Sequence, residues 1–183
     1  MDEKLLAVLI AQPDSITLIR SLLNGDKDLS FGSGGIKKVY IGFIQRPRIS
    51  TVKTDDLDRI ILAGGKSEVD REDFLIIRLL ETGDIDISFA MEGISITNPG
   101  ASTFSYDKTK DFIVTPDNEI IICGYLDIDG SNLRLAVGKF DNTGSLDFTF
   151  GSNGFINSGE ISRTETFQSN VVFLQNDSKI ILS

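Results

Sequence analysis

The sequence predicts an all-β fold made of repeated units of four short antiparallel strands. A loop motif occurs three times, starting at Gly25, Gly83 and Gly144, and a short apolar block recurs with nearly the same spacing. The local patterns are short apolar or alternating runs bounded by turn residues, which are typical of strands, and no segment has a convincing helical period. A regular repeat of this kind indicates units that bury their faces only against their neighbours.

The loop motif has the form G-x-x-D-apolar-[S/T]-F-[G/A] and occupies residues 25–32, 83–90 and 144–151. A cation stands five residues before each leading glycine. The shared positions are Arg20, Arg78 and Lys139; Gly25, Gly83 and Gly144; Asp28, Asp86 and Asp147; and Phe31, Phe89 and Phe150. Their recurrence in every unit favours a structural role, with the aspartate capping turn amides and pairing with the cation.

Within one unit the expected strands follow in order, each ended by a turn signal. The apolar block is found at 58–64, 118–124 and 178–182. In the second unit it is followed by strands at 74–80, 94–97 and 112–114, which turns at 82–84, 98–100 and 116–118 separate. The units are therefore placed at 3–57, 58–117 and 118–177. An extra terminal strand at 178–183 repeats the position of the first strand.

Composition indicates one folded domain spanning residues 1–183. The chain is 40% hydrophobic and 25% charged, and 27 acidic against 18 basic residues give a net charge of −9. That charge repels phosphate backbones and anionic lipid, so we expect no nucleic-acid partner. No apolar run approaches a membrane span, so we expect no membrane insertion. The apolar run 5–11 follows acidic residues, unlike a signal peptide, and leaves the compartment open.

The absence of histidine and the single Cys123 exclude histidine-based triads, multi-cysteine zinc sites and intrachain disulfides. Cys123 lies in an apolar strand and is interpreted as a small buried hydrophobe.

Residues 63–67, Ala-Gly-Gly-Lys-Ser, mimic the end of a phosphate-binding loop. The motif requires glycine where Ile60 stands, and a helix after it, so we interpret the segment as a strand-connecting loop. We expect no cofactor and assign no catalytic residue.

One loop has the beginning of a calcium-binding pattern. Asp127, Asp129 and Ser131 supply alternating oxygen ligands around Gly130. The twelfth position of a calcium loop carries a glutamate, and here it holds Gly138. A plain hairpin loop is therefore the favoured interpretation.

Repeated four-stranded antiparallel units are typical of the blades of a β-propeller. The stretch 144–154, Gly-Ser-Leu-Asp-Phe-Thr-Phe-Gly-Ser-Asn-Gly, resembles the delta-60 repeat, a bacterial β-propeller repeat of uncharacterised function. The resemblance covers essentially the whole chain and departs from the pattern at Ala90 and in the short first unit. It implies three four-stranded blades of about 60 residues, a surface or secreted bacterial context and no known catalytic residues.

Three blades do not close a ring, because propellers have about 4–8. The preferred solution is a homodimer that closes a six-bladed ring by exchanging a terminal strand, and the alternative is a piece of a longer repeat protein. The expected function is a non-enzymatic scaffold that binds protein or glycan. Two alternatives stay open: a hydrolase that uses carboxylates in an acidic channel, and a structural spacer of a larger surface protein.

Overall fold

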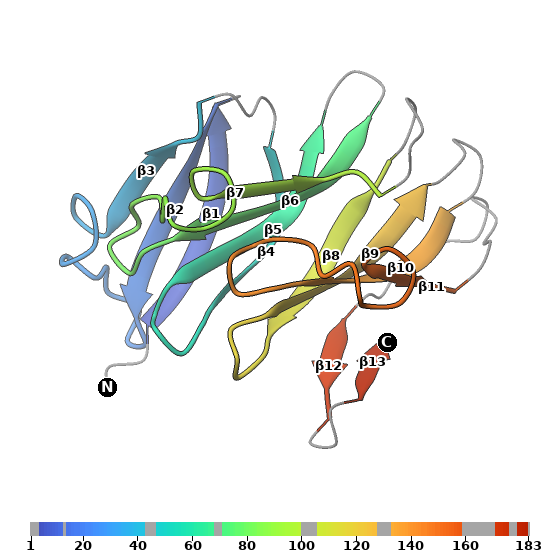
Figure 1. The fold of residues 1–183 in the computed structure, drawn as a ribbon. Coiled ribbons are helices and arrows are strands. Elements are labelled where there is room, and N and C mark those ends of the chain that lie inside the picture. Colours follow the sequence, from blue (N-terminus) through green and yellow to red (C-terminus); the bar gives the residue numbers. More distant parts are fainter. Residues whose placement is uncertain are drawn as a thin grey trace.

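The fold consists of antiparallel sheets lying side by side along the chain (Figure 1). The computed structural model describes residues 4–12, 14–42, 47–67, 71–99, 106–127, 133–158, 171–175 and 179–182. Every regular element in these ranges is a strand, which confirms the all-β prediction. Among them there is no helix long and apolar enough to cross a membrane.

Each sheet joins strands that are consecutive in the sequence. The first sheet contains β1 (Lys4–Gln12), β2 (Ser15–Leu22) and β3 (Ile36–Tyr40). The second contains β4 (Pro47–Thr54), β5 (Ile60–Ser67), β6 (Glu72–Leu79) and β7 (Ile94–Thr97). The third contains β8 (Lys108–Val114), β9 (Ile120–Asp127), β10 (Leu133–Phe140) and β11 (Phe155–Asn157). Finally, β12 (Val172–Leu174) pairs with β13 (Ile180–Leu182).

The sheets do not coincide with the units drawn from the sequence. β4 and β8 lie near the ends of the units 3–57 and 58–117, yet they pair with β5 and β9 of the following unit. The cause is a tight turn at each border, in which Asp58 and Asn118 take positive φ values of 57° and 60°. Four strands are complete in the second and third sheets, whereas the described residues give three in the first and two in the last.

The first strands of successive sheets lie next to one another. The Asp111 carboxylate of β8 forms an ion pair with Lys53 of β4, with 2.8 Å between Oδ1 and Nζ. On its other side the same carboxylate accepts the main-chain N–H of Val172 in β12 at 3.3 Å. The β12–β13 hairpin therefore follows the third sheet as the third follows the second.

The second sheet is buried on both faces because it lies between its two neighbours. Successive side chains of a strand point to opposite faces. Ile60 and Leu62 of β5 accordingly pack in a cluster with the first sheet, while Ile61 and Ala63 pack with the third. All residues of β6 are buried. This explains why the sequence of these strands is a continuous apolar run and not a clean alternation.

A glycine faces a β-bulge in both four-stranded sheets. The pairing register shifts between Ile49 and Thr51 of β4, and between Thr109 and Asp111 of β8. Gly64 and Gly124 lie opposite these bulges, where a Cβ atom would collide with the carbonyl oxygens of Arg48 and Lys108. The segment 63–67, expected as a loop, is instead part of β5; that prediction was wrong because the glycines admit the close backbone approach of a bulged strand pair.

We predict that Gly124→Ala lowers the free energy of unfolding by about 2–3 kcal/mol, because the added methyl group meets main-chain atoms that cannot rotate away. Thr54→Ala, at an exposed strand end, should stay within about 0.5 kcal/mol of the wild type. Urea unfolding followed by circular dichroism measures both. Equal midpoints for the two variants would contradict the steric role of the glycine.

Candidate functional site

The repeated motif folds the same way in all three copies. It lies in the loops β2–β3, β6–β7 and β10–β11, residues 23–35, 80–93 and 141–154, which we call the motif loops. The leading glycines have φ values of 89°, 82° and 87°, which L side chains rarely adopt. In each loop the aspartate N–H donates to the carbonyl of the preceding cation, at 3.0, 3.0 and 2.8 Å.

The motif aspartate caps the turn that follows it. Asp28 Oδ1 accepts hydrogen bonds from the Ser30 amide at 3.0 Å and from the Ser30 hydroxyl at 2.5 Å. Asp86 and Ser88, and Asp147 and Thr149, repeat this arrangement. The hydrogen bond from the Ser30 hydroxyl is the main reason that the pKa of Asp28 lies below its usual range.

The other oxygen of each aspartate receives the cation. Arg20 Nε donates to Asp28 Oδ2, and Arg78 Nε to Asp86 Oδ2, both at 2.7 Å. Burial raises the pKa of Asp86, but hydrogen bonds from Ser88 and Arg78 outweigh it and hold that pKa below normal. Each guanidinium also lies over the motif phenylalanine, 4.3 Å from the Phe31 centroid and 4.4 Å from that of Phe89.

The third copy has a looser cluster. Lys139 Nζ lies 3.3 Å from Asp147 Oδ2 but 2.8 Å from Glu119 Oε1. The hydrogen bond to Glu119 is the first cause that raises the pKa of Lys139. A lysine ammonium is a single charged group, so it lacks the fork that lets arginine bind an aspartate and another acceptor together.

The motif also fastens each loop to the next one along the chain. Arg20 Nη1 donates to the Glu81 carbonyl at 3.0 Å, and Arg78 Nη1 to the Asn142 carbonyl at 2.8 Å. Sequence reasoning anticipated the cation beside the aspartate but missed this second bond. The repeated spacing of cation and glycine was the available signal, but this spacing does not predict which neighbouring loop the cation contacts.

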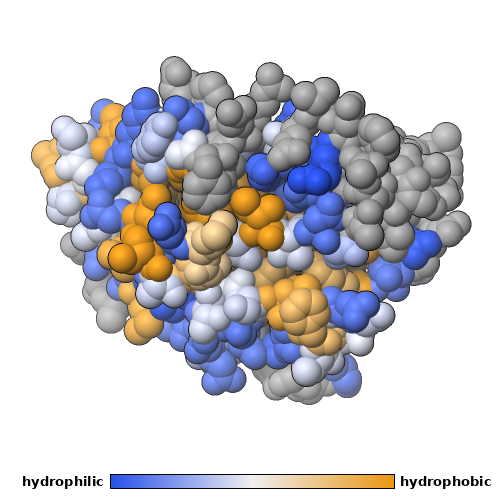
Figure 2. Space-filling model, turned by 45° about the horizontal axis from the view of Figure 1, so that its top comes forward, coloured by the Kyte–Doolittle hydropathy of each residue, from blue (hydrophilic) through white to orange (hydrophobic). Residues whose placement is uncertain are grey.

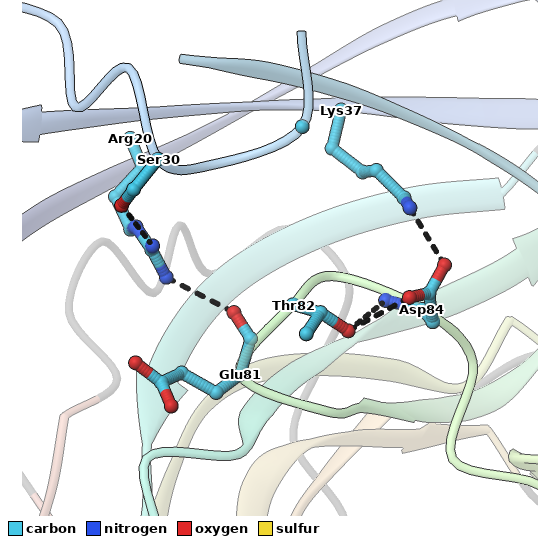
Figure 3. Close-up of a pocket in the computed structure, with 7 residues that line it drawn as sticks. Arg20, Ser30, Lys37, Glu81, Thr82 and Asp84 are labelled. Carbon is cyan, nitrogen blue, oxygen red and sulfur yellow. Dashed lines mark hydrogen bonds and ion pairs between the residues drawn. The ribbon is translucent and has the colours of Figure 1, made fainter.

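An open cleft of about 370 Å³ lies where the first two motif loops meet. Figure 3 shows Arg20 directed at the main-chain oxygen of Glu81, and Lys37 directed at Asp84. The Lys37–Asp84 distance is 2.6 Å, and Thr82 Oγ1 donates to the other Asp84 oxygen at 2.8 Å. Arg20 and Lys37 are thus engaged in joining the two loops, and the described residues of the cleft include no histidine or cysteine to act as a nucleophile.

A group of buried acidic residues lies between the second and third sheets. Asp73 and Asp107 are 2% and 0% exposed, and Asp107 Oδ1 accepts the amide of Asp127 at 2.9 Å. Asp107 Oδ2 has no hydrogen-bond partner among the described residues. Burial is the main cause that raises the pKa of Asp107 to about 7, and the nearby Asp73 and Asp127 raise it further. The sequence did not single out this aspartate.

Of the calcium candidates, Asp127 is buried in β9, while Asp129 and Ser131 lie outside the described residues. In the part of the chain that the structure describes, no three acidic, histidine or cysteine side chains are arranged to hold a metal ion. Cys123 is buried, as expected, and burial raises the pKa of its thiol to about 11, so it is protonated at neutral pH.

Comparison of the chain with protein-family models, curated proteins and solved structures found no match. The common property of the site residues is that the repeated polar groups satisfy one another across neighbouring loops.

We predict that Arg78→Ala destabilises the protein by about 3–5 kcal/mol, because it leaves the buried Asp86 charge without its partner. Lys108→Ala, a half-buried cation outside the motif, should change stability far less. Calorimetric melting temperatures of the two variants check this. Equal melting temperatures would show that the buried pair is not needed for stability.

Asp107 should make the protein less stable as the pH rises. Its pKa is about 7 in the fold against an ordinary value of 3.8, so the folded state binds the extra proton between these values. Stability contributed by this group is therefore complete below about pH 4 and lost as the pH rises through 7. Asp107→Asn mimics the protonated form, and we expect it to raise the melting temperature at pH 8 but not at pH 4.

Asp117→Asn, an exposed change in the β8–β9 turn, is the matched control for charge removal. Thermal melts from pH 4 to 8 compare both variants with the wild type. A parallel pH profile for Asp107→Asn and the wild type would refute the raised pKa.

Proposed function

We propose that this chain is a β-propeller-type repeat module of the delta-60 kind, and that it serves as a non-enzymatic scaffold for a protein partner. The repeated motif, its resemblance to the delta-60 pattern and the stacking of successive four-stranded sheets support the propeller assignment. In this proposal the motif loops form one rim of the module, and partners bind there.

An exposed apolar side chain at the same position of every motif loop carries the proposal. The residue after the capping aspartate is Leu29, Ile87 or Phe148, with 75%, 78% and 71% of its surface exposed. Neither the turn nor the stack of sheets uses these side chains. Figure 2 shows hydrophobic residues among hydrophilic ones on one face of the molecule.

The chemistry of this row favours a protein over a glycan. Two of its three members are aliphatic, and they offer no ring face for a sugar to stack on. Burying a leucine, isoleucine or phenylalanine contributes about 1.5–3 kcal/mol, so three such contacts supply a large part of the roughly 8 kcal/mol that corresponds to a micromolar peptide complex. Exposed Asp26 in the first of these loops, with the net charge of −9, favours a partner segment that is apolar and basic.

Asp107 supports a second candidate, the carboxylate-using hydrolase. A carboxyl group with a pKa of about 7 beside other acidic residues has the protonation needed for a general acid. Its zero exposure separates it from any substrate, which favours the scaffold. Hydrolysis of a panel of chromogenic glycosides that disappears in Asp107→Asn would establish the hydrolase instead.

We predict that the variant Leu29→Ser/Ile87→Ser/Phe148→Ser binds peptide partners at least 10-fold more weakly than the wild type. Peptides are first selected on the wild-type chain from a random phage-displayed library, and dissociation constants are then measured by biolayer interferometry. The expected selection is rich in apolar and basic residues. Loss of the three apolar contacts should raise the dissociation constant without changing the melting temperature, since these side chains are exposed.

The control variant Tyr40→Ser/Leu57→Ser removes two comparably exposed hydrophobic side chains outside the motif loops, and it should bind like the wild type. Peptides that bind the triple variant unchanged would reject the rim as the binding surface. Binding to a glycan array, with no peptide enriched, would show that the partner is a glycan and not a protein.

A further inference from the structure

The contact between successive motif loops is a phenylalanine placed on a glycine, and the chain builds it twice. Phe31 lies against Gly83, where a Cβ atom would be 2.9 Å from the ring. Phe89 lies against Gly144, where the corresponding distance is 2.5 Å. Both rings are buried, with 1% and 0% exposure, and both glycines are buried. Glycine is thus required because the ring of the preceding loop occupies the space of a side chain.

We call each of these phenylalanine–glycine contacts between successive motif loops a joint. Polar contacts beside the ring and the glycine complete each joint. The arginine under the ring donates to the carbonyl two residues before the glycine, Glu81 in one joint and Asn142 in the other. The strand after the loop adds a third contact: Lys37 pairs with Asp84 at 2.6 Å, and Ser95 Oγ donates to the Gly144 carbonyl at 2.9 Å. The joint therefore has a ring face on one loop and a glycine face on the next.

One half of this joint is left over at each end of the series. Gly25 is exposed, and a Cβ atom built on it has no atom within 4 Å. Phe150 is only partly buried, unlike Phe31 and Phe89. Ile156, which corresponds to Lys37 and Ser95, is 50% exposed. Within the described residues, the first motif loop thus offers a glycine face without a ring, and the third offers a ring without a glycine face.

We propose that two copies of this chain associate head to tail, with Phe150 of each copy packed on Gly25 of the other. Lys139 would then approach the Leu23 carbonyl, which corresponds to the Glu81 and Asn142 carbonyls. Each copy supplies both surfaces, so the two equivalent contacts are related by a two-fold axis and close the pair into a ring. Two copies bring six motif loops together, which lies within the range of about 4–8 blades of known propellers.

The strand order fits the same partner. β1 is the edge strand of a sheet whose described residues lack a strand corresponding to β4 and β8. β12 is that strand for the following sheet, as its contact with Asp111 places it beside β8. Docking brings β12 of one copy next to β1 of the other and completes a sheet of four strands. β13 corresponds to β1 in the repeat and pairs with β12 within one chain. In the dimer, the β1 strand of the partner copy would displace β13 and pair with β12.

Light scattering on a sizing column tests the association. The wild type should have twice the 20.0 kDa mass of one chain. Phe150→Asp should have the mass of a single chain, because a charged carboxylate would be buried against Gly25 of the other copy in place of the apolar ring. Phe148→Asp introduces the same charge two residues away, on the exposed rim, and should keep the mass of the dimer.

A second variant acts on the opposite face and avoids the core. Gly25→Asn places a side chain where the structure has open space, and asparagine tolerates positive φ, so the single chain should fold. We expect it to be a monomer as well. A wild type that is monomeric at every concentration, or a Gly25→Asn variant that stays dimeric, overturns the proposal. The latter result would indicate that Phe150 packs on a surface other than Gly25.

The proposal does not rest on the binding function of the rim. The triple serine variant of Leu29, Ile87 and Phe148 keeps Gly25 and Phe150, so it should remain a dimer while losing peptide binding. A variant that loses one property and keeps the other therefore separates failure of the rim from failure of the association.

Discussion

The joint between motif loops organises the described part of the molecule. Arg78 lies between three groups: the Asp86 carboxylate, the Phe89 ring and the Asn142 carbonyl of the next loop. The guanidinium has enough donors, in a fixed planar arrangement, to serve all of them while buried. One side chain thereby fixes the conformation of its own loop and the position of its neighbour. These ties between loops add to the apolar clusters through which neighbouring sheets pack.

The stack in turn explains the apolar composition of the middle strands. A sheet with one neighbour needs one apolar face, whereas a sheet between two neighbours needs both. β6 is buried along its whole length for this reason, and its charged Asp73 and Arg78 each have an ion-pair partner. The cost of that burial is visible at Asp107, whose pKa of about 7 reflects a carboxyl group that the packing of two sheets removes from water.

Stacking also separates the two kinds of exposed apolar surface. Leu29, Ile87 and Phe148 are exposed in every loop regardless of its neighbours, so their exposure does not report on the ends of the stack. Phe150 differs, because its counterparts Phe31 and Phe89 are covered by a following loop. Among the described residues, equivalent positions thus differ in two ways: the side chain after the capping aspartate is exposed in every loop, whereas the motif phenylalanine is fully buried only where the next loop covers it.

The sequence by itself determined the all-β class, the repeat and the residues that hold each motif loop, because strand periodicity and turn chemistry are local. It also placed the cation near Asp28, Asp86 and Asp147, since both belong to one short segment. Only the tertiary structure decided where sheets begin and which loop the Phe31 and Phe89 rings cover. It alone revealed the buried Asp107. These features depend on which segments meet in space, and a repeat of equal units leaves that choice open.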